Sequence, residues 1–417
     1  MAGQPRSATG HTMEERKEPS QSGLVLTSTV LYCAGALIFT FMPAYLGAID
    51  KLLRVSPAAL GALAAAELWA IAFASLTAPL WIGRLDWRVW ARIGAMTSLA
   101  GQLASLWVTD FNLLLAVRIV TGAMGEGVLM ALSYSLLGQT HNVERSFGIA
   151  YGVSIAIGTV CLYFNLQLDR ASGSIGVLAV LAMLAVLACL MSFLVAPNLR
   201  RPAADDRLHP LRPVPAIRAA WRSVAIWVSV AQAIWYAGAG SFWSFAEQLA
   251  AHNAMPSAQI AQVMGIGTAA ALIGTLLTIG MANRFGRRVP TIVSTLLTAV
   301  AIFAFARTSG FLLATSELAL FNIFWACGTI YLTAAACSFD SSGKIAVLLP
   351  AFQTIGMALG TFVLGRSIRD FGFEIAPWVA GAFLMVGMLL ALLCMTLRKR
   401  ELGADIARMS LESSRAG

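Results

Sequence analysis

The sequence changes character abruptly at residue 197. Residues 174–196 read SIGVLAVLAMLAVLACLMSFLVA and contain no charged side chain, whereas residues 197–221 read PNLRRPAADDRLHPLRPVPAIRAAW and contain five prolines and five arginines. An uncharged apolar run of about 20 residues is long enough to cross the hydrocarbon core of a bilayer as a helix. The first stretch therefore predicts a transmembrane helix, and the second predicts a polar linker outside the membrane.

Similar apolar runs recur along the whole chain of 417 residues, of which 58% are hydrophobic and only 12% are charged. Soluble domains have roughly 25% charged residues, so this composition excludes a soluble enzyme and a disordered chain. Backbone polar groups must be paired inside the bilayer, so the spans are expected to be helices. We predict an all-α membrane protein with twelve spans, at residues 24–49, 58–82, 90–109, 111–138, 146–168, 174–196, 222–250, 259–281, 289–306, 311–337, 343–367 and 374–397.

The distribution of basic residues predicts the orientation. If the N-terminus lies inside, the cytoplasmic segments hold 22 of the 29 lysines and arginines, the outer loops hold 6, and Arg118 lies within a helix. Cytoplasmic loops of membrane proteins carry the excess of basic residues. We therefore expect a multi-pass protein of the cell (inner) membrane with both termini in the cytoplasm.

The polar linker at 197–221 divides the chain into two nearly equal parts. Residues 24–196 and 222–397 each contain six predicted helices, which indicates an internal duplication. The remaining segments, 1–23 and 398–417, are expected to be cytoplasmic tails. The predicted fold is therefore two six-helix bundles joined by a cytoplasmic linker.

The loop between the eighth and ninth predicted helices carries a recognisable motif, Ala282-Asn283-Arg284-Phe285-Gly286-Arg287-Arg288. It is similar to a loop signature of the major facilitator superfamily, which reads small residue, Asp, Arg, any residue, Gly, Arg, Arg. Asn283 replaces the usual Asp. The equivalent loop of the first half, Gly83-Arg84-Leu85-Asp86-Trp87-Arg88, keeps an acid but lacks the Gly-Arg-Arg end. In the fourth predicted helix, Arg118 followed by Gly122 also matches the family.

This resemblance covers roughly residues 24–397 and implies two bundles around a central cavity. It also implies a cytoplasmic gate, formed by Asp86, Arg88, Asn283, Arg284, Gly286, Arg287 and Arg288. The residues alone indicate that Gly286 allows a tight turn and that the arginines suit the carboxyl end of the preceding helix. The alternative reading of these arginines is ordinary positive-inside anchoring.

Three charged residues lie inside predicted spans: Glu67, Arg118 and Glu126. Each costs roughly 2.5–3.5 kcal/mol at the centre of a helix, which makes it a functional candidate. Arg118 and Glu126 are separated by about 12 Å along a regular helix and point roughly 80° apart, so we expect no direct ion pair. Protonating a glutamate at pH 7 costs about 3.7 kcal/mol, close to the cost of inserting the charge. We therefore predict proton coupling at Glu126, and also at Glu67, with substrate binding or a structural hydrogen bond as the alternatives.

Polar and aromatic residues recur near the midplane of several predicted helices. In the resembled family, the first, fourth, seventh and tenth helices line the cavity. Buried amides need partners and aromatic rings form rigid walls, a combination that suits a small organic molecule with a ring or a carboxylate. Packing or interfacial anchoring is the alternative. The predicted substrate residues are Arg118, Tyr32, Thr40, Met130, Tyr134, Gln232, Trp235, Tyr236, Asn322, Trp325, Tyr331 and Gln353.

Glycine pairs recur in the fifth, eighth and eleventh predicted helices: Gly148 and Gly152, Gly267 and Gly274, and Gly356 and Gly360. Small residues let helices approach closely. We expect these helices to form the sliding contact between the two halves, although packing within each half would explain the same pattern.

We predict a secondary active transporter that moves a small organic solute, with a lean towards uptake of an organic anion, by alternating access and proton coupling. Efflux of drugs or metabolites by proton antiport is the alternative, which the missing Gly-Pro-rich motif in the fifth helix disfavours. A substrate sensor or a lipid scramblase on the same scaffold is a further alternative. The chain has no nucleotide-binding loop, zinc pattern or paired cysteine pattern, so we expect no enzyme activity, cofactor, metal or nucleic-acid partner. We expect a monomer in the lipid bilayer.

Overall fold

The computed structural model describes residues 21–82, 86–137, 140, 143–172, 175–194, 223–281, 284–339 and 344–416, and the regular elements within these ranges are all helices. In the first half they are α1 (Gln21–Leu53), α2 (Pro57–Trp81), α3 (Trp87–Trp107), α4 (Phe111–Val120), the π-helix η1 (Thr121–Glu126), α5 (Gly127–Leu137), α6 (Val143–Ser172) and α7 (Ile175–Leu194). α4, η1 and α5 are continuous and form one span.

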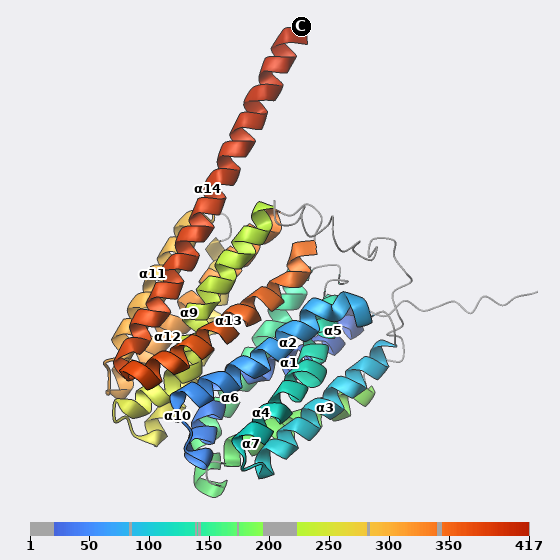
Figure 1. The fold of residues 1–417 in the computed structure, drawn as a ribbon. Coiled ribbons are helices and arrows are strands. Elements are labelled where there is room, and N and C mark those ends of the chain that lie inside the picture. The colour runs from blue at the N-terminus through green and yellow to red at the C-terminus, as the bar shows by residue number, and fades with distance from the viewer. Residues whose placement is uncertain are drawn as a thin grey trace, which may run out of the picture.

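In the second half the helices are α9 (Val224–His252), α10 (Ser257–Met281), α11 (Arg288–Phe305), α12 (Phe311–Ser338), α13 (Lys344–Phe371), the 3-10 turn η3 (Phe373–Ile375) and α14 (Ala376–Ala416). All twelve predicted spans are thus confirmed as helices. α14 continues beyond the predicted span, through the segment expected to be a tail, and projects from the bundle (Figure 1).

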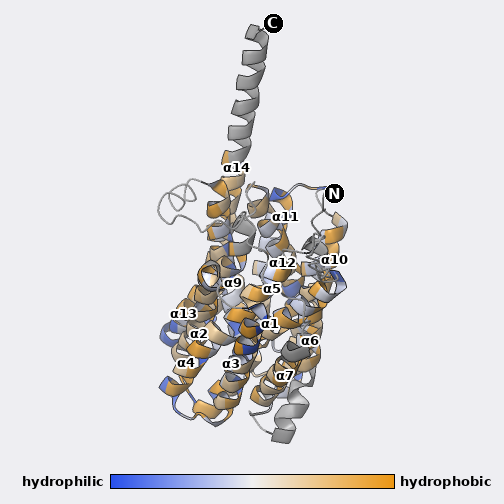
Figure 2. Ribbon diagram, turned by 90° about the vertical axis from the view of Figure 1, so that its right-hand side faces the viewer, coloured by the Kyte–Doolittle hydropathy of each residue, from blue (hydrophilic) through white to orange (hydrophobic). Residues whose placement is uncertain are grey.

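The helices have the length and surface of membrane spans. Among the described residues, nine helices are long and apolar enough to cross a membrane, and the described parts of α6 and α7 form shorter apolar helices. Large apolar side chains such as Leu276 and Ile279 are about two-thirds exposed on the outside of the bundle. Apolar residues therefore extend over much of the length of the helices (Figure 2).

Short polar residues determine where several helices begin. The side chains of Ser56, Asp86, Asp110 and Ser223 accept hydrogen bonds from backbone N–H groups in the first turns of α2, α3, α4 and α9. These caps satisfy backbone donors that a helix leaves unpaired at its start. Pro57 occupies the first turn of α2, where its missing N–H has no consequence.

The two halves meet along two long helix pairs, α2 with α13 and α6 with α10, and α1 also contacts α9. Figure 1 shows α1–α7 grouped on one side and α9–α14 on the other, with α2 beside α13. Gly61 of α2 and Gly365 of α13 bring the two backbones into close contact. Where α1 ends, Lys51 Nζ lies 3.8 Å from Glu247 Oε1 of α9, so the two halves are also in contact at this end.

The three predicted helices do form the junction of the halves, since α6 packs against α10 and α13 packs against α2, but the glycine pairs of α10 and α13 do not make this contact. Gly356 and Gly360 face the carbonyl groups of Ala233 and Ala237 in α9, and Gly274 faces Ile323 in α12. All three contacts lie within the second half, because these glycines bring neighbouring helices of one bundle together. Gly152 of α6 does face the other half, where its nearest neighbour is Leu272 of α10.

Candidate functional site: a buried charge network beside a central cavity

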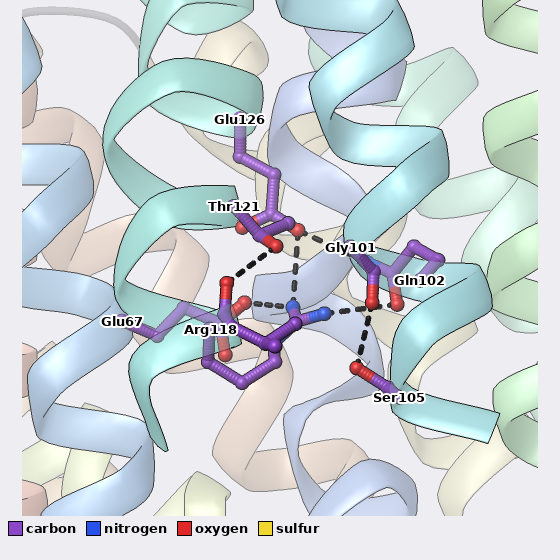
Figure 3. Close-up of polar contacts among 8 residues, drawn as sticks. Glu67, Gly101, Gln102, Ser105, Arg118, Thr121 and Glu126 are labelled. Atoms are coloured by element: carbon purple, nitrogen blue, oxygen red, sulfur yellow. Dashed lines mark hydrogen bonds and ion pairs between the residues drawn. The ribbon is translucent and has the colours of Figure 1, made fainter. Parts of the chain in front are cut away.

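A cluster of charged and amide side chains is buried inside the first half (Figure 3). The Arg118 guanidinium donates to the Glu67 carboxylate of α2 and lies 3.2 Å from Glu126 Oε1 at the end of η1. Arg118 Nη1 also donates to Gln102 Oε1 of α3 at 3.0 Å, and Gln102 Nε2 donates to Glu126 Oε1 at 3.1 Å. Arg118 and Glu67 are fully buried, and Glu126 is 2% exposed. We call these four residues the charge network.

The expectation that Arg118 and Glu126 do not meet is wrong, and the π-helix explains why. The prediction assumed a regular α-helix, in which the two side chains diverge around the axis. η1 covers Thr121–Glu126, and its i→i+5 pattern turns less per residue than an α-helix. Glu126 therefore rotates back onto the face of Arg118, and the two long side chains span the remaining distance.

Glycines on this span bring the neighbouring helices close enough to join the network. A Cβ on Gly122 would lie 2.7 Å from the carbonyl oxygen of Glu67, and one on Gly125 would lie 2.9 Å from the backbone nitrogen of Ser98. η1 thus sits directly against α2 and α3. Because the backbones are in contact there, Glu67 and Gln102 reach Arg118 from two different helices.

The network contains one positive and two negative groups. The Oε2 atoms of Glu67 and Glu126 and the Nε of Arg118 are buried without a hydrogen-bond partner. The guanidinium also lies 5.1 Å from the centre of the Tyr45 ring, at a distance typical of a cation–π contact. When both carboxyls are ionised, the negative groups outnumber the positive one, a costly arrangement away from water.

A cavity of about 120 Å³ lies between the two halves. Its lining combines aromatic rings, hydroxyl groups and amides from both bundles. Eight of the twelve predicted substrate residues line it: Tyr32, Thr40, Met130, Tyr134, Tyr236, Asn322, Trp325 and Gln353. A contact with substrate stays a prediction for each of them.

The other four predicted substrate residues are not brought into this cavity. Arg118 belongs to the charge network. Gln232 donates to Thr333 Oγ1 at 2.9 Å, and the Trp235 indole, fully buried, donates to Thr295 Oγ1 at 3.0 Å. Tyr331 is also buried but does not line the cavity.

Sequence reasoning missed several residues of both sites. Tyr151 and Ser154 of α6 line the cavity, as does Trp243 of α9. Tyr151 and Ser154 are three residues apart and therefore lie on one face of a helix, a pattern that could have indicated a cavity lining. Gln102 could also have been found, because it is an amide within an apolar span, the same feature that singled out Gln232.

The predicted gate residues lie at helix ends. Gly286 has a φ of 64°, in the left-handed region that favours glycine, so the tight turn is confirmed. Arg288 Nη2 donates to the carbonyl oxygen of Met395 at 2.8 Å, and Asp86 accepts from the backbone N–H of Arg88 at 2.9 Å. Asn283 lies outside the described residues. Gating by this set stays a prediction, since the described contacts of Asp86 and Arg88 stay at the start of α3.

Comparison with known proteins places this architecture in a family. The family model of the Major Facilitator Superfamily matches residues 24–361. No curated protein matches the chain at a significant level. Among solved structures, the nucleoside transporter NupG is 15% identical with a TM-score of 0.66, covering 91% of this chain and 99% of its own. A D-xylose-proton symporter is 16% identical with a TM-score of 0.69, covering 89% and 97%.

The inward open conformation of the xylose transporter XylE from E. coli is 15% identical with a TM-score of 0.68, covering 90% of this chain and 96% of its own. At these identities the structural likeness shows a common fold. The family match covers most of the chain and agrees with the twelve helices and the loop motif. The chain therefore belongs to the major facilitator superfamily.

Proposed function

We propose that the protein is a proton-coupled secondary transporter that moves a small organic solute by alternating access. The observation that carries this proposal is the charge count of the buried network, where Arg118 faces the carboxyls of both Glu67 and Glu126. An arginine stays protonated in proteins, so only the carboxyls can take up or release a proton. One bound proton leaves a balanced pair, whereas its loss leaves a buried negative charge that water or a moving helix must compensate.

The span formed by η1 and α5 connects the charge network to the cavity. Met130 and Tyr134 line the cavity one and two turns beyond Glu126. Gly35 of α1 lies directly against the backbone of Glu126 and Met130, so this part of the span packs tightly. A solute that displaces Met130 or Tyr134 would therefore act on the segment that positions Glu126.

The contacts between the two halves support alternating access. Trp243 Nε1 of α9 donates to the carbonyl oxygen of Phe39 in α1 at 2.8 Å beside the cavity, and Lys51 lies beside Glu247 nearer the end of α1. With both termini in the cytoplasm, this end faces the outside. These contacts would have to separate for the cavity to open outwards. The fold shared with the inward open XylE and with a protein described as a D-xylose-proton symporter supports this reading.

The charge of the solute is constrained by the position of Arg118. Arg118 is the one cation among the predicted substrate residues and would be the partner of an organic anion, but it already contacts two carboxylates and is fully buried. The proposal therefore keeps a small organic solute without the anionic charge. Proton-antiport efflux would use the same network, and the direction of the pH gradient that drives flux distinguishes it from uptake. We further propose that the protein works as a monomer in the inner membrane.

The test is Glu126→Gln, which keeps the size of the side chain and its ability to form hydrogen bonds but cannot take up or release a proton. Uridine, D-xylose and nicotinamide are screened in proteoliposomes, and the solute that wild-type protein accumulates is used. We expect the variant to exchange this solute at equilibrium and to lose accumulation driven by a pH gradient. Glu317→Gln is the matched control, because Glu317 of α12 lies outside the network and bonds to Thr308. Full accumulation by Glu126→Gln would contradict the coupling role.

A further inference from the structure

We infer that the central cavity selects an uncharged solute that combines a flat ring with a hydrogen-bonding edge, and that it disfavours carboxylate and phosphate anions. This inference rests on the proposed function, because it takes the cavity between the halves as the transport site. The chemistry of the residues that line the cavity then restricts which small organic solutes can bind.

The first observation is the absence of charge. None of the described residues that line the cavity is Asp, Glu, Lys, Arg or His. An anion moved from water into such a site loses its hydration and gains no counter-charge, which costs far more than burying a hydroxyl or an amide. The charge network also disfavours an anion, because the carboxyl-bearing Glu126 lies one helical turn from Met130 of the cavity lining.

The second observation is the pair of aromatic walls. Tyr32 and Tyr134 of the first half have ring centres 5.9 Å apart. In the second half, Trp325 lies 6.1 Å from both Tyr236 and Trp243. Aromatic faces contact flat rings over a large area at little cost in conformational freedom. Because the walls belong to opposite halves, a flat solute between them would contact both bundles.

The third observation is the set of polar groups that remain available. Asn322 Nδ2 donates to the carbonyl oxygen of Leu318 at 3.0 Å, and the rest of its amide is not engaged in a described bond. The hydroxyl protons of Thr268 and Thr354 are donated to carbonyls of their own helices, so their oxygens can still accept. The Trp325 indole N–H lies beside Tyr236 without a well-formed hydrogen bond. Donors and acceptors are thus both present, as a neutral hydroxyl- or amide-bearing solute requires.

The size of the cavity limits the solute. A volume of about 120 Å³ is below the roughly 300–1,000 Å³ of sites that hold drug-sized ligands. A single ring with a few polar substituents is therefore a better match than a multi-ring drug.

The experiment uses pairs of solutes that share shape and differ in charge: nicotinamide with nicotinate, and benzamide with benzoate, together with uridine. Binding to the purified full-length protein is measured by tryptophan fluorescence, since Trp243 and Trp325 line the cavity. We expect each amide to bind at least tenfold more tightly than its carboxylate. Equal or tighter binding of the carboxylates, or no binding by any neutral member, would overturn the inference.

A substitution in the lining tests whether the solute binds in this cavity. Asn322→Ala is expected to weaken binding of the tightest neutral solute at least fivefold, with little change in melting temperature. The matched control is Asn253→Ala, which removes an amide that holds the end of α11 through Phe305, Ala306 and Thr308 and lies outside the cavity. That control should lower the melting temperature and leave affinity unchanged. Unchanged affinity in Asn322→Ala would contradict the assignment.

The two levels of the proposal can fail separately. Accumulation of nicotinate or benzoate under a pH gradient would overturn the solute class and leave proton coupling intact. Tight binding of neutral solutes with no response to a pH gradient would leave the class intact and remove the coupling.

Discussion

The fourth helix of each half offers a direct comparison between two regions of the molecule. One span begins at Phe111 and the other at Phe311, so positions can be matched by their distance from the start. Where the first span has Arg118 and Glu126, the second has Leu318 and Ala326. The first span contains the π-helix η1, whereas α12 is an uninterrupted α-helix from Phe311 to Ser338.

The surroundings of the two spans differ in the same way. Glu67 and Gln102 complete a charged network in the first half, whereas Trp235 bonds to Thr295 in the second half through neutral groups. The two groups of six helices thus hold different chemistry. We interpret the first half as the site of proton coupling, and the cavity between the halves as the site of solute binding.

The largest expected effect is that of Arg118→Leu. It leaves two carboxyls buried without a counter-charge, and removing one partner of a buried ion pair costs about 3–5 kcal/mol. We expect a marked fall in the melting temperature in detergent. Trp235→Phe is the control in the second half and should cost less, about 1–3 kcal/mol, for one lost hydrogen bond and a small cavity at a fully buried position.

Replacing all three charged residues of the charge network by leucine tests whether the loss of stability comes from unpaired charge. Glu67→Leu and Glu126→Leu added to Arg118→Leu should recover much of the stability, because apolar replacements of buried ion clusters are often neutral or stabilising. Coupling to the pH gradient should remain lost. A single Arg118→Leu variant as stable as Trp235→Phe would contradict the contrast between the halves.

Adding a methyl group where helix backbones touch should destabilise both halves equally, because the two halves differ in buried charge and not in the closeness of their helix packing. Gly122→Ala would place a Cβ against the backbone of Glu67, and Gly360→Ala would place one against Ala237. Each should destabilise by about 1–3 kcal/mol, as expected for overpacking. Gly148→Ala is the control, since nothing lies within 4 Å of that position. Thermal unfolding of the three variants is the measurement, and a stable Gly360→Ala variant would count against the packing.

A smaller effect is expected at the junction of the halves. Trp243→Phe removes the hydrogen bond to the Phe39 carbonyl, which contributes about 0.5–1.5 kcal/mol. The outward-open population should rise by about two- to tenfold, because 1.4 kcal/mol corresponds to a factor of ten. Spin labels at Leu52 and Ser257 would report this as longer distances. Trp378→Phe, at an exposed tryptophan of α14, should leave the distances unchanged.

The smallest effect is expected for Tyr45→Phe, which removes the hydroxyl of Tyr45 and keeps its ring. The hydroxyl is buried without a partner, so Tyr45→Phe should be neutral or slightly stabilising. Tyr45→Leu is the comparison variant and should cost clearly more, because it removes the ring beside Arg118, with a cation–π contact of about 0.5–2 kcal/mol, and leaves a cavity at a fully buried position. Urea- or heat-induced unfolding of both variants checks the order. A destabilised Tyr45→Phe variant would show that the hydroxyl has a role of its own.

Much of the fold could be predicted because hydrophobicity in a bilayer leaves few alternatives. Runs of apolar residues specify helices, and the break at 197–221 separates two groups of six. Packing partners could not be predicted in the same way. Gly360 has the same sequence signature whether it faces α9 or the other half, since the partner depends on the arrangement of the bundles.

The sequence predicted most residues of the candidate site but not the contacts between them. Glu67, Arg118 and Glu126 were recognisable because charges are rare in membrane helices. Their contact was missed, because a regular helix was assumed where the chain forms the π-helix η1. Such a segment depends on how α2 and α3 pack around it, and nothing in the local sequence specifies it.

The most direct test of the central claim is solute-induced proton movement. Proteoliposomes containing a pH-sensitive dye are given uridine, or the solute found to accumulate, in the absence of an imposed pH gradient. Wild-type protein is expected to move protons together with the solute, and Glu126→Gln is expected to move the solute without protons. Equal proton movement by both proteins would show that coupling does not depend on Glu126.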